Sequence, residues 1–137
     1  MADSSSQETR VIAAYLDDVD EELVTVRLLI AEPRTRFAAF HLQQAAEKLV
    51  KAVRLSHGLV VTADHSIARL LEALPADDAW RTKLAVLEPL SSYATAFRYP
   101  SSMGKRKPGI AADEALAWIA TIAALSAEAR KLLAPDS

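Results

Sequence analysis

Apolar residues recur at intervals of three and four along most of the chain, the spacing that places side chains on one face of an α-helix. The first run ends before Pro33 and has the seam of a bundle helix: Ile12, Leu16, Val19, Leu23, Val26 and Ile30. The second run lies between Pro33 and Gly58 and has a continuous apolar side: Ala38, Ala39, Leu42, Ala45, Ala46, Leu49, Val50, Ala52 and Val53. Two long amphipathic helices are therefore predicted, with Pro33 ending the first.

Three further helices are predicted, over residues 62 or 64 to 74, about 77 to 97, and about 110 to 133. The first of these is short, with Thr62 or Asp64 as its N-terminal cap. Pro89 is expected to kink or split the second. A Pro-, Ser- and Gly-containing loop over residues 99–109 precedes the last. The expected apolar positions are Ile67, Leu70, Leu71 and Leu74; Trp80, Leu84, Leu87, Leu90, Tyr93 and Phe97; and Leu116, Ile119, Ile122 or Ala123, and Leu125 or Ala129.

Composition supports a helical fold. The chain has 137 residues, enough for one domain, and 51% of them are apolar while only three are glycine. We find no strand pattern and no internal repeat. The sequence is therefore predicted to be all-α, an antiparallel four-helix bundle with an additional short helix. Residues 1–9 are expected to be a flexible N-terminal tail, and residues 10–133 the bundle domain.

Charge and cysteine content narrow the classes of function. The formal net charge of −2 offers no broad attraction to nucleic acid or to anionic membranes, so any such contact must be local. The absence of cysteine excludes disulfides, thiolate metal sites and cysteine nucleophiles. The polar N-terminus is unlike a signal peptide, and the longest uncharged apolar-rich run, residues 115–127, is too short to span a bilayer. We therefore expect a soluble, cytoplasmic protein without membrane contact.

The polar half of the second helix, residues 36–54, carries the first candidate site. One row holds Gln43, Glu47 and Arg54, and a second row holds His41, Gln44, Lys48 and Lys51. An imidazole, an amide and two ammonium groups on one ridge suit a phosphate or the edge of a base. The alternative is a solvated face on which Glu47 and Lys51 form an (i, i+4) pair. Phe37 and Phe40 lie on this same side, which indicates that its beginning is covered by another helix or a second subunit.

The second candidate is the segment Phe-Arg-Tyr-Pro at residues 97–100, followed by the basic run at 105–107. Arg98, Tyr99 and Lys105 are candidate contacts to a nucleotide or RNA, because arginine binds phosphate in a bidentate way. Alternatively, Arg98 satisfies the last carbonyls of its helix. An acidic run from Asp17 to Glu22 suits a solvated face better than a cation site. No cluster has metal-ligand spacing, so neither metal nor cofactor is expected.

Several segments together resemble the HEPN domain family over about residues 10–133. They are Gln-Gln-Ala-Ala-Glu-Lys-x-x-Lys-Ala at 43–52, His-x-x-x-x-Leu-Leu at 65–71, and Arg-Tyr-Pro at 98–100. The resemblance implies an antiparallel helical bundle that is frequently a homodimer. It also implies nucleotide or RNA binding, with a minimal nucleotidyltransferase as partner or a role in a toxin–antitoxin type system. Some members of the family are metal-independent ribonucleases that use an Arg-x4–6-His motif near the later helices.

The sequence departs from that ribonuclease motif. No histidine follows His65, so Arg98 lacks a partner at the required spacing. Arg36 and His41 fit Arg-x4-His, but in the second helix rather than at the family's catalytic position. Two interpretations follow. The first is a non-catalytic module that binds a nucleotide, RNA or a nucleotidyltransferase. The alternative is a toxin-like ribonuclease that uses Arg36 and His41, or Arg98 with a histidine from elsewhere.

Overall fold

The structure is a computed structural model that describes residues 4–32, 34–93, 103–104 and 109–135. Its helices are α1 (Ser4–Ala31), α2 (Thr35–Ser56), α3 (Ile67–Glu72), α4 (Ala79–Leu84), the 3-10 helix η1 (Ala85–Ser92) and α6 (Ala112–Leu133). The described residues contain no strand. The prediction of an all-α fold is confirmed.

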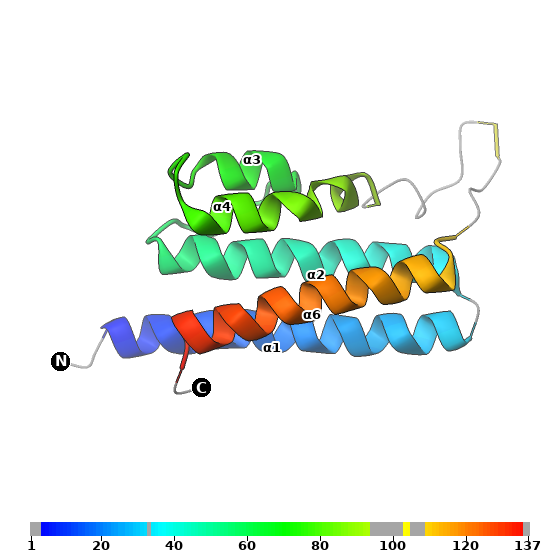
Figure 1. The fold of residues 1–137 in the computed structure, drawn as a ribbon, viewed down its shortest axis with the longest axis horizontal. Coiled ribbons are helices and arrows are strands. Elements are labelled where there is room, and N and C mark those ends of the chain that lie inside the picture. Colours follow the sequence, from blue (N-terminus) through cyan, green and yellow to red (C-terminus); the bar gives the residue numbers. More distant parts are fainter. Residues whose placement is uncertain (1–3, 33, 94–102, 105–108, 136–137) are drawn as a thin grey trace.

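The bundle is built around α2. Figure 1 shows α1, α2, the α4–η1 segment and α6 alternating in direction, with the short α3 beside α4. Helix α2 contacts α1, α6, α3 and η1, so that it has neighbours on most of its circumference. This position explains why the apolar side of α2 is wholly buried, as the periodicity of its sequence predicted. It also means that part of its polar side must lie inside the protein.

The later helices follow the prediction with two local differences. Pro89 lies in η1, and the α-helix that begins at Ala79 ends at Leu84. Proline removes a backbone donor and clashes with the carbonyl four residues earlier, so the expected splitting is confirmed. Helix α3 begins later than predicted: its cap is Ser66, whose hydroxyl accepts a hydrogen bond from the Arg69 amide at 3.2 Å. The caps predicted at Thr62 and Asp64 are therefore wrong.

Both ends of the chain also differ from the sequence prediction. Helix α1 begins at Ser4, so most of the predicted tail of residues 1–9 is helical. In α6 the buried face is formed by Ala115, Ile119, Ile122, Ser126 and Ala129. Leu116, which was predicted to be buried, is 46% exposed because it lies one position from this face. Among the described residues, no helix combines the length and apolar character needed to cross a membrane.

Candidate functional site

The first polar row of α2 is buried. Gln43 is fully buried, and Glu47 and Arg54 are only 3% and 6% exposed. Buried polar and charged groups are costly unless they are hydrogen-bonded, so each needs a partner within the fold. The sequence left open whether this half of α2 is a wet face or a covered one. The structure shows that this row is covered.

Glu47 is the centre of a hydrogen-bonded cluster. Its carboxylate accepts hydrogen bonds from Gln43 of the preceding turn, from Lys51 Nζ at 3.0 Å, and from His65 Nδ1 at 2.7 Å. Gln44 extends the cluster by donating to the Gln43 side-chain oxygen at 2.9 Å. The buried carboxylate is therefore compensated by one cation and two further donors. His65 lies just before α3, so its hydrogen bond to Glu47 also holds the segment between α2 and α3 against α2.

Arg54 makes a second connection between α2 and the following segment. Its guanidinium donates to the Leu70 carbonyl at 2.8 Å and to the Val60 carbonyl at 3.1 Å. Val60 lies just after α2 and Leu70 lies within α3. Arg54 thus holds both ends of the α2–α3 connection, and the fork geometry of a guanidinium suits this double contact.

Glu22 of α1 contacts the second polar row of α2, the ridge formed by His41, Gln44, Lys48 and Lys51. It accepts hydrogen bonds from His41 Nδ1 at 2.6 Å and from Lys48 Nζ at 2.8 Å, and its side chain is 13% exposed. Partial burial favours the protonated carboxyl group. The hydrogen bonds and charges of His41 and Lys48 outweigh this, and hold the pKa of Glu22 below its ordinary value. Farther along the surface, Arg130 of α6 donates to Asp17 and Asp20, so the acidic run of α1 also contacts α6.

Replacing Glu22 with glutamine is expected to lower the free energy of unfolding at pH 7 by about 1–2 kcal/mol. Because the pKa of Glu22 is lower in the folded protein, its stabilising effect is present above its unfolded-state pKa of about 4.3 and is lost as the pH falls through the folded-state value. Urea unfolding at pH 7 and pH 3 measures this. The difference between the wild type and Glu22→Gln should be smaller at pH 3 than at pH 7. An equal difference at both values would contradict the ion-pair assignment.

The structure brings four of the predicted site residues together and does not describe the other three. His41, Gln44, Lys48 and Lys51 are half-buried along one ridge, and each is hydrogen-bonded to a carboxylate or amide of the protein. Arg98, Tyr99 and Lys105 lie outside the described residues. Lys48 pairs with Glu22 and Lys51 pairs with Glu47, so the ridge has no excess of positive charge. The ridge thus connects helices, and ligand binding by these residues stays a prediction.

The beginning of α2 contains a pocket that the sequence analysis missed. It has a volume of about 250 Å³ and is lined by Arg34, Thr35, Arg36, Phe37 and Gly109. Phe37 is 45% exposed, whereas Phe40 is half-buried and forms a T-shaped pair with the His41 ring at a centroid distance of 5.2 Å. Within this chain, the predicted covering of these two aromatics therefore applies to Phe40 and not to Phe37. Two arginines followed by an aromatic residue, directly after Pro33, were the available signal in the sequence.

Comparison with known proteins places this arrangement in a family. The chain matches the model of the HEPN domain family over residues 12–132. This protein belongs to the HEPN domain family. Its structure is similar to the crystal structure of TT1696 from Thermus thermophilus, with a TM-score of 0.66 and 28% identity over 85% of this chain and 96% of that one. No curated protein matches the chain significantly.

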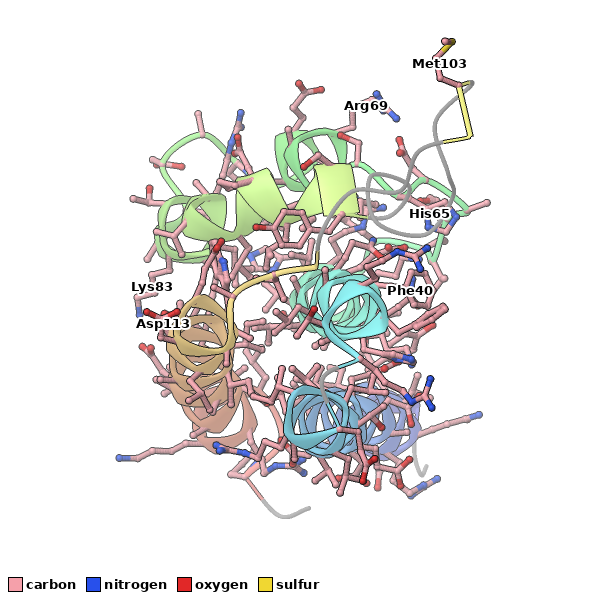
Figure 2. The ribbon with its side chains drawn as sticks, turned by 90° about the vertical axis from the view of Figure 1, so that its right-hand side faces the viewer. Phe40, His65, Arg69, Lys83, Met103 and Asp113 are labelled. Carbon is pink, nitrogen blue, oxygen red and sulfur yellow. The ribbon has the colours of Figure 1, made fainter. Side chains whose placement is uncertain are left out.

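In this HEPN domain, the two described segments that carry the family resemblance meet in space. Glu47 belongs to the Gln-Gln-Ala-Ala-Glu-Lys segment and accepts its hydrogen bond from His65, which opens the His-x-x-x-x-Leu-Leu segment. Figure 2 shows Phe40 of α2 and His65 on the same flank of the molecule. The last two residues of the later segment, Leu70 and Leu71, are buried. In the described part of this HEPN chain, the two segments therefore join α2 to α3.

Proposed function

We propose that this HEPN domain is a non-catalytic module that binds a nucleotide or RNA. The nucleotide or RNA ligand is supported by membership of the HEPN family. The non-catalytic role rests on the divergence of Arg36 and His41, which form the Arg-x4-His pattern of the sequence. Five residues along an α-helix correspond to a rotation of about 140° around its axis. Arg36 accordingly lines the pocket at the beginning of α2, while His41 donates to Glu22 of α1 on another side. Two groups that point in different directions do not act together on one phosphodiester bond.

We further propose that the domain functions as a homodimer, and either as the partner of a minimal nucleotidyltransferase or as part of a toxin–antitoxin type system. Membership of the HEPN family supports this part of the proposal. Sedimentation of the purified protein tests the dimer, and co-purification with a nucleotidyltransferase encoded beside it tests the partner. A monomer at all protein concentrations would contradict the dimer.

The main experiment measures binding and cleavage on the same preparation. ATP, GTP and a short single-stranded RNA are titrated calorimetrically at low and moderate salt, and the same RNA is incubated with the protein and resolved on a gel. We expect binding of at least one ligand, weaker at the higher salt, and intact RNA. In the cleavage assay His41→Ala should behave like the wild type and leave the RNA intact. His57→Ala serves as a control outside the ridge, since His57 bonds to Asp78 near α4.

Two results would contradict the proposal. If no ligand is bound at either salt concentration, the domain is not a nucleotide- or RNA-binding module. If the wild type cleaves RNA and His41→Ala abolishes cleavage while His57→Ala does not, the ribonuclease alternative is correct. In that case Arg36 and His41 would have to act from different subunits, because within one chain they diverge.

A further inference from the structure

The pocket at the beginning of α2 differs in charge from the ridge. Its described lining contains two arginines and no carboxylate, whereas Lys48 and Lys51 of the ridge each face a glutamate. Arg34 is exposed, so its guanidinium meets a ligand without a large cost of rearrangement. Figure 2 views the bundle from the end at which α2 begins, where this pocket lies. An anion entering here would meet the exposed positive charge of Arg34.

The aromatic ring of Phe37 is the second part of the pocket. The side chain is 45% exposed, and the guanidinium carbon of Arg36 lies 5.5 Å from the centroid of its ring. Exposed aromatic rings beside guanidinium groups are the usual platform for unpaired bases, because every base has a face that can stack. Phe37 is thus available to a planar ligand in a way that the half-buried Phe40 is not.

One wall of the pocket is formed by the backbone of Gly109. A Cβ atom added to Gly109 would lie 2.5 Å from the carbonyl carbon of Thr35, so only glycine allows this approach of the two segments. The chain before α6 is therefore held directly against the first residue of α2. With this wall in place, the Thr35 side chain borders the same space as the arginines and Phe37.

From these features we infer that the pocket binds one phosphorylated nucleotide unit. Its base stacks on Phe37, and its phosphate contacts Arg34, with Arg36 and the Thr35 hydroxyl beside it. The volume of about 250 Å³ is smaller than the pockets that enclose a whole drug-sized ligand, and fits part of a larger or partly exposed molecule. The unit is either a free mononucleotide or one nucleotide of a single-stranded RNA. This inference rests on the proposed function and adds the position and chemistry of the site.

Calorimetric titration with four probes tests the inference: AMP, adenosine, inorganic phosphate and a single-stranded RNA hexamer with a 5′-phosphate. Phe37→Ala is expected to weaken AMP binding about 10-fold, since stacking on an aromatic residue contributes on this scale. Phe37→Trp should retain AMP binding, because indole also stacks. Arg34→Ala is expected to weaken AMP and phosphate binding by about 10-fold and to leave adenosine binding unchanged.

The controls are Arg10→Ala and Leu132→Ala, which remove an exposed arginine and an exposed apolar side chain from the other end of the bundle. Both should bind AMP like the wild type. If the hexamer binds more tightly than AMP and responds to the same two pocket substitutions, the nucleotide belongs to an RNA strand. Equal or weaker binding of the hexamer identifies a free nucleotide.

Two outcomes separate failure of the inference from failure of the proposed function. If the wild type binds AMP or the hexamer, and Phe37→Ala and Arg34→Ala bind them equally well, the pocket assignment is wrong and the proposed function stands. In that case Lys48→Ala tests the ridge next. If the wild type binds none of the four probes but binds ATP or GTP, only the inference about the pocket is wrong; if it also binds neither ATP nor GTP, both are wrong. Circular dichroism of each variant checks that the helical content is unchanged, as expected for substitutions at exposed positions.

Discussion

Substitution of Glu47 by alanine is expected to lower the free energy of unfolding by about 3–5 kcal/mol. The carboxylate is only 3% exposed and accepts hydrogen bonds from Gln43, Lys51 and His65. Its removal leaves the fully buried Gln43 amide and the Lys51 ammonium, whose side chain is 13% exposed, without this acceptor. Removing one partner of a buried ion pair lowers the free energy of unfolding by more than the intact pair adds to it, because the remaining charge stays buried without a partner. His65, 66% exposed, can return to water.

Urea unfolding monitored by circular dichroism measures this effect, and two variants make the result interpretable. Glu47→Gln keeps a carbonyl oxygen as acceptor and is expected to lose less stability than Glu47→Ala. Glu128→Ala removes a glutamate whose partner is Lys83 at the surface, with both side chains 39% exposed, and should cost no more than about 1 kcal/mol. If Glu47→Ala costs as little as Glu128→Ala, the cluster around Glu47 does not hold α2 to the following segment.

The long helices could be predicted because their apolar positions repeat with the helical period. In α1 and α2 the apolar side is narrow and continuous, and the residues predicted to be buried there, apart from the half-buried Ile30, are buried. The prediction failed where several neighbouring residues suited the same role equally well. Helix α6 is apolar or small on most sides, so periodicity did not decide between Ala115 and Leu116. Thr62, Asp64 and Ser66 are all good caps, and the Ile67 amide is also bonded to the distant Ser91 hydroxyl at 2.9 Å.

The candidate site was predicted less completely, for a related reason. Spacing along α2 separated its polar residues into two rows, but which row is buried depends on partners in other elements. Glu22 comes from α1, His65 and Val60 from the segment after α2, and Leu70 from α3. The pocket at the beginning of α2 likewise needs Gly109, which no local pattern connects with Phe37. Contacts of this kind are tertiary, so the sequence indicates the chemical groups and the fold decides which of them meet.

Arg54→Ala is expected to lower the free energy of unfolding by about 2–4 kcal/mol. Arg54 is 6% exposed and donates to the carbonyls of Val60 and Leu70, which lie on either side of the α2–α3 connection. Its removal leaves two carbonyl groups without these donors and a cavity where the side chain packed. The effect should be local first, so amide hydrogen exchange across residues 58–72 should accelerate more than exchange in α1.

Two arginine variants distinguish the double contact from a general loss of charge. Arg54→Lys keeps the charge and replaces the planar fork by a single ammonium, which cannot match both carbonyls, so an intermediate loss is expected. Arg81→Ala removes an arginine that donates to one carbonyl, that of Leu74 at 3.0 Å, and should cost about 1 kcal/mol. If Arg54→Ala and Arg81→Ala destabilise equally, or if exchange in residues 58–72 is unchanged, Arg54 does not fasten the connection. If stability instead increases from Arg54→Ala to Arg54→Lys to the wild type, it follows the number of carbonyl contacts. That order would show that the guanidinium of Arg54 holds α3 to α2.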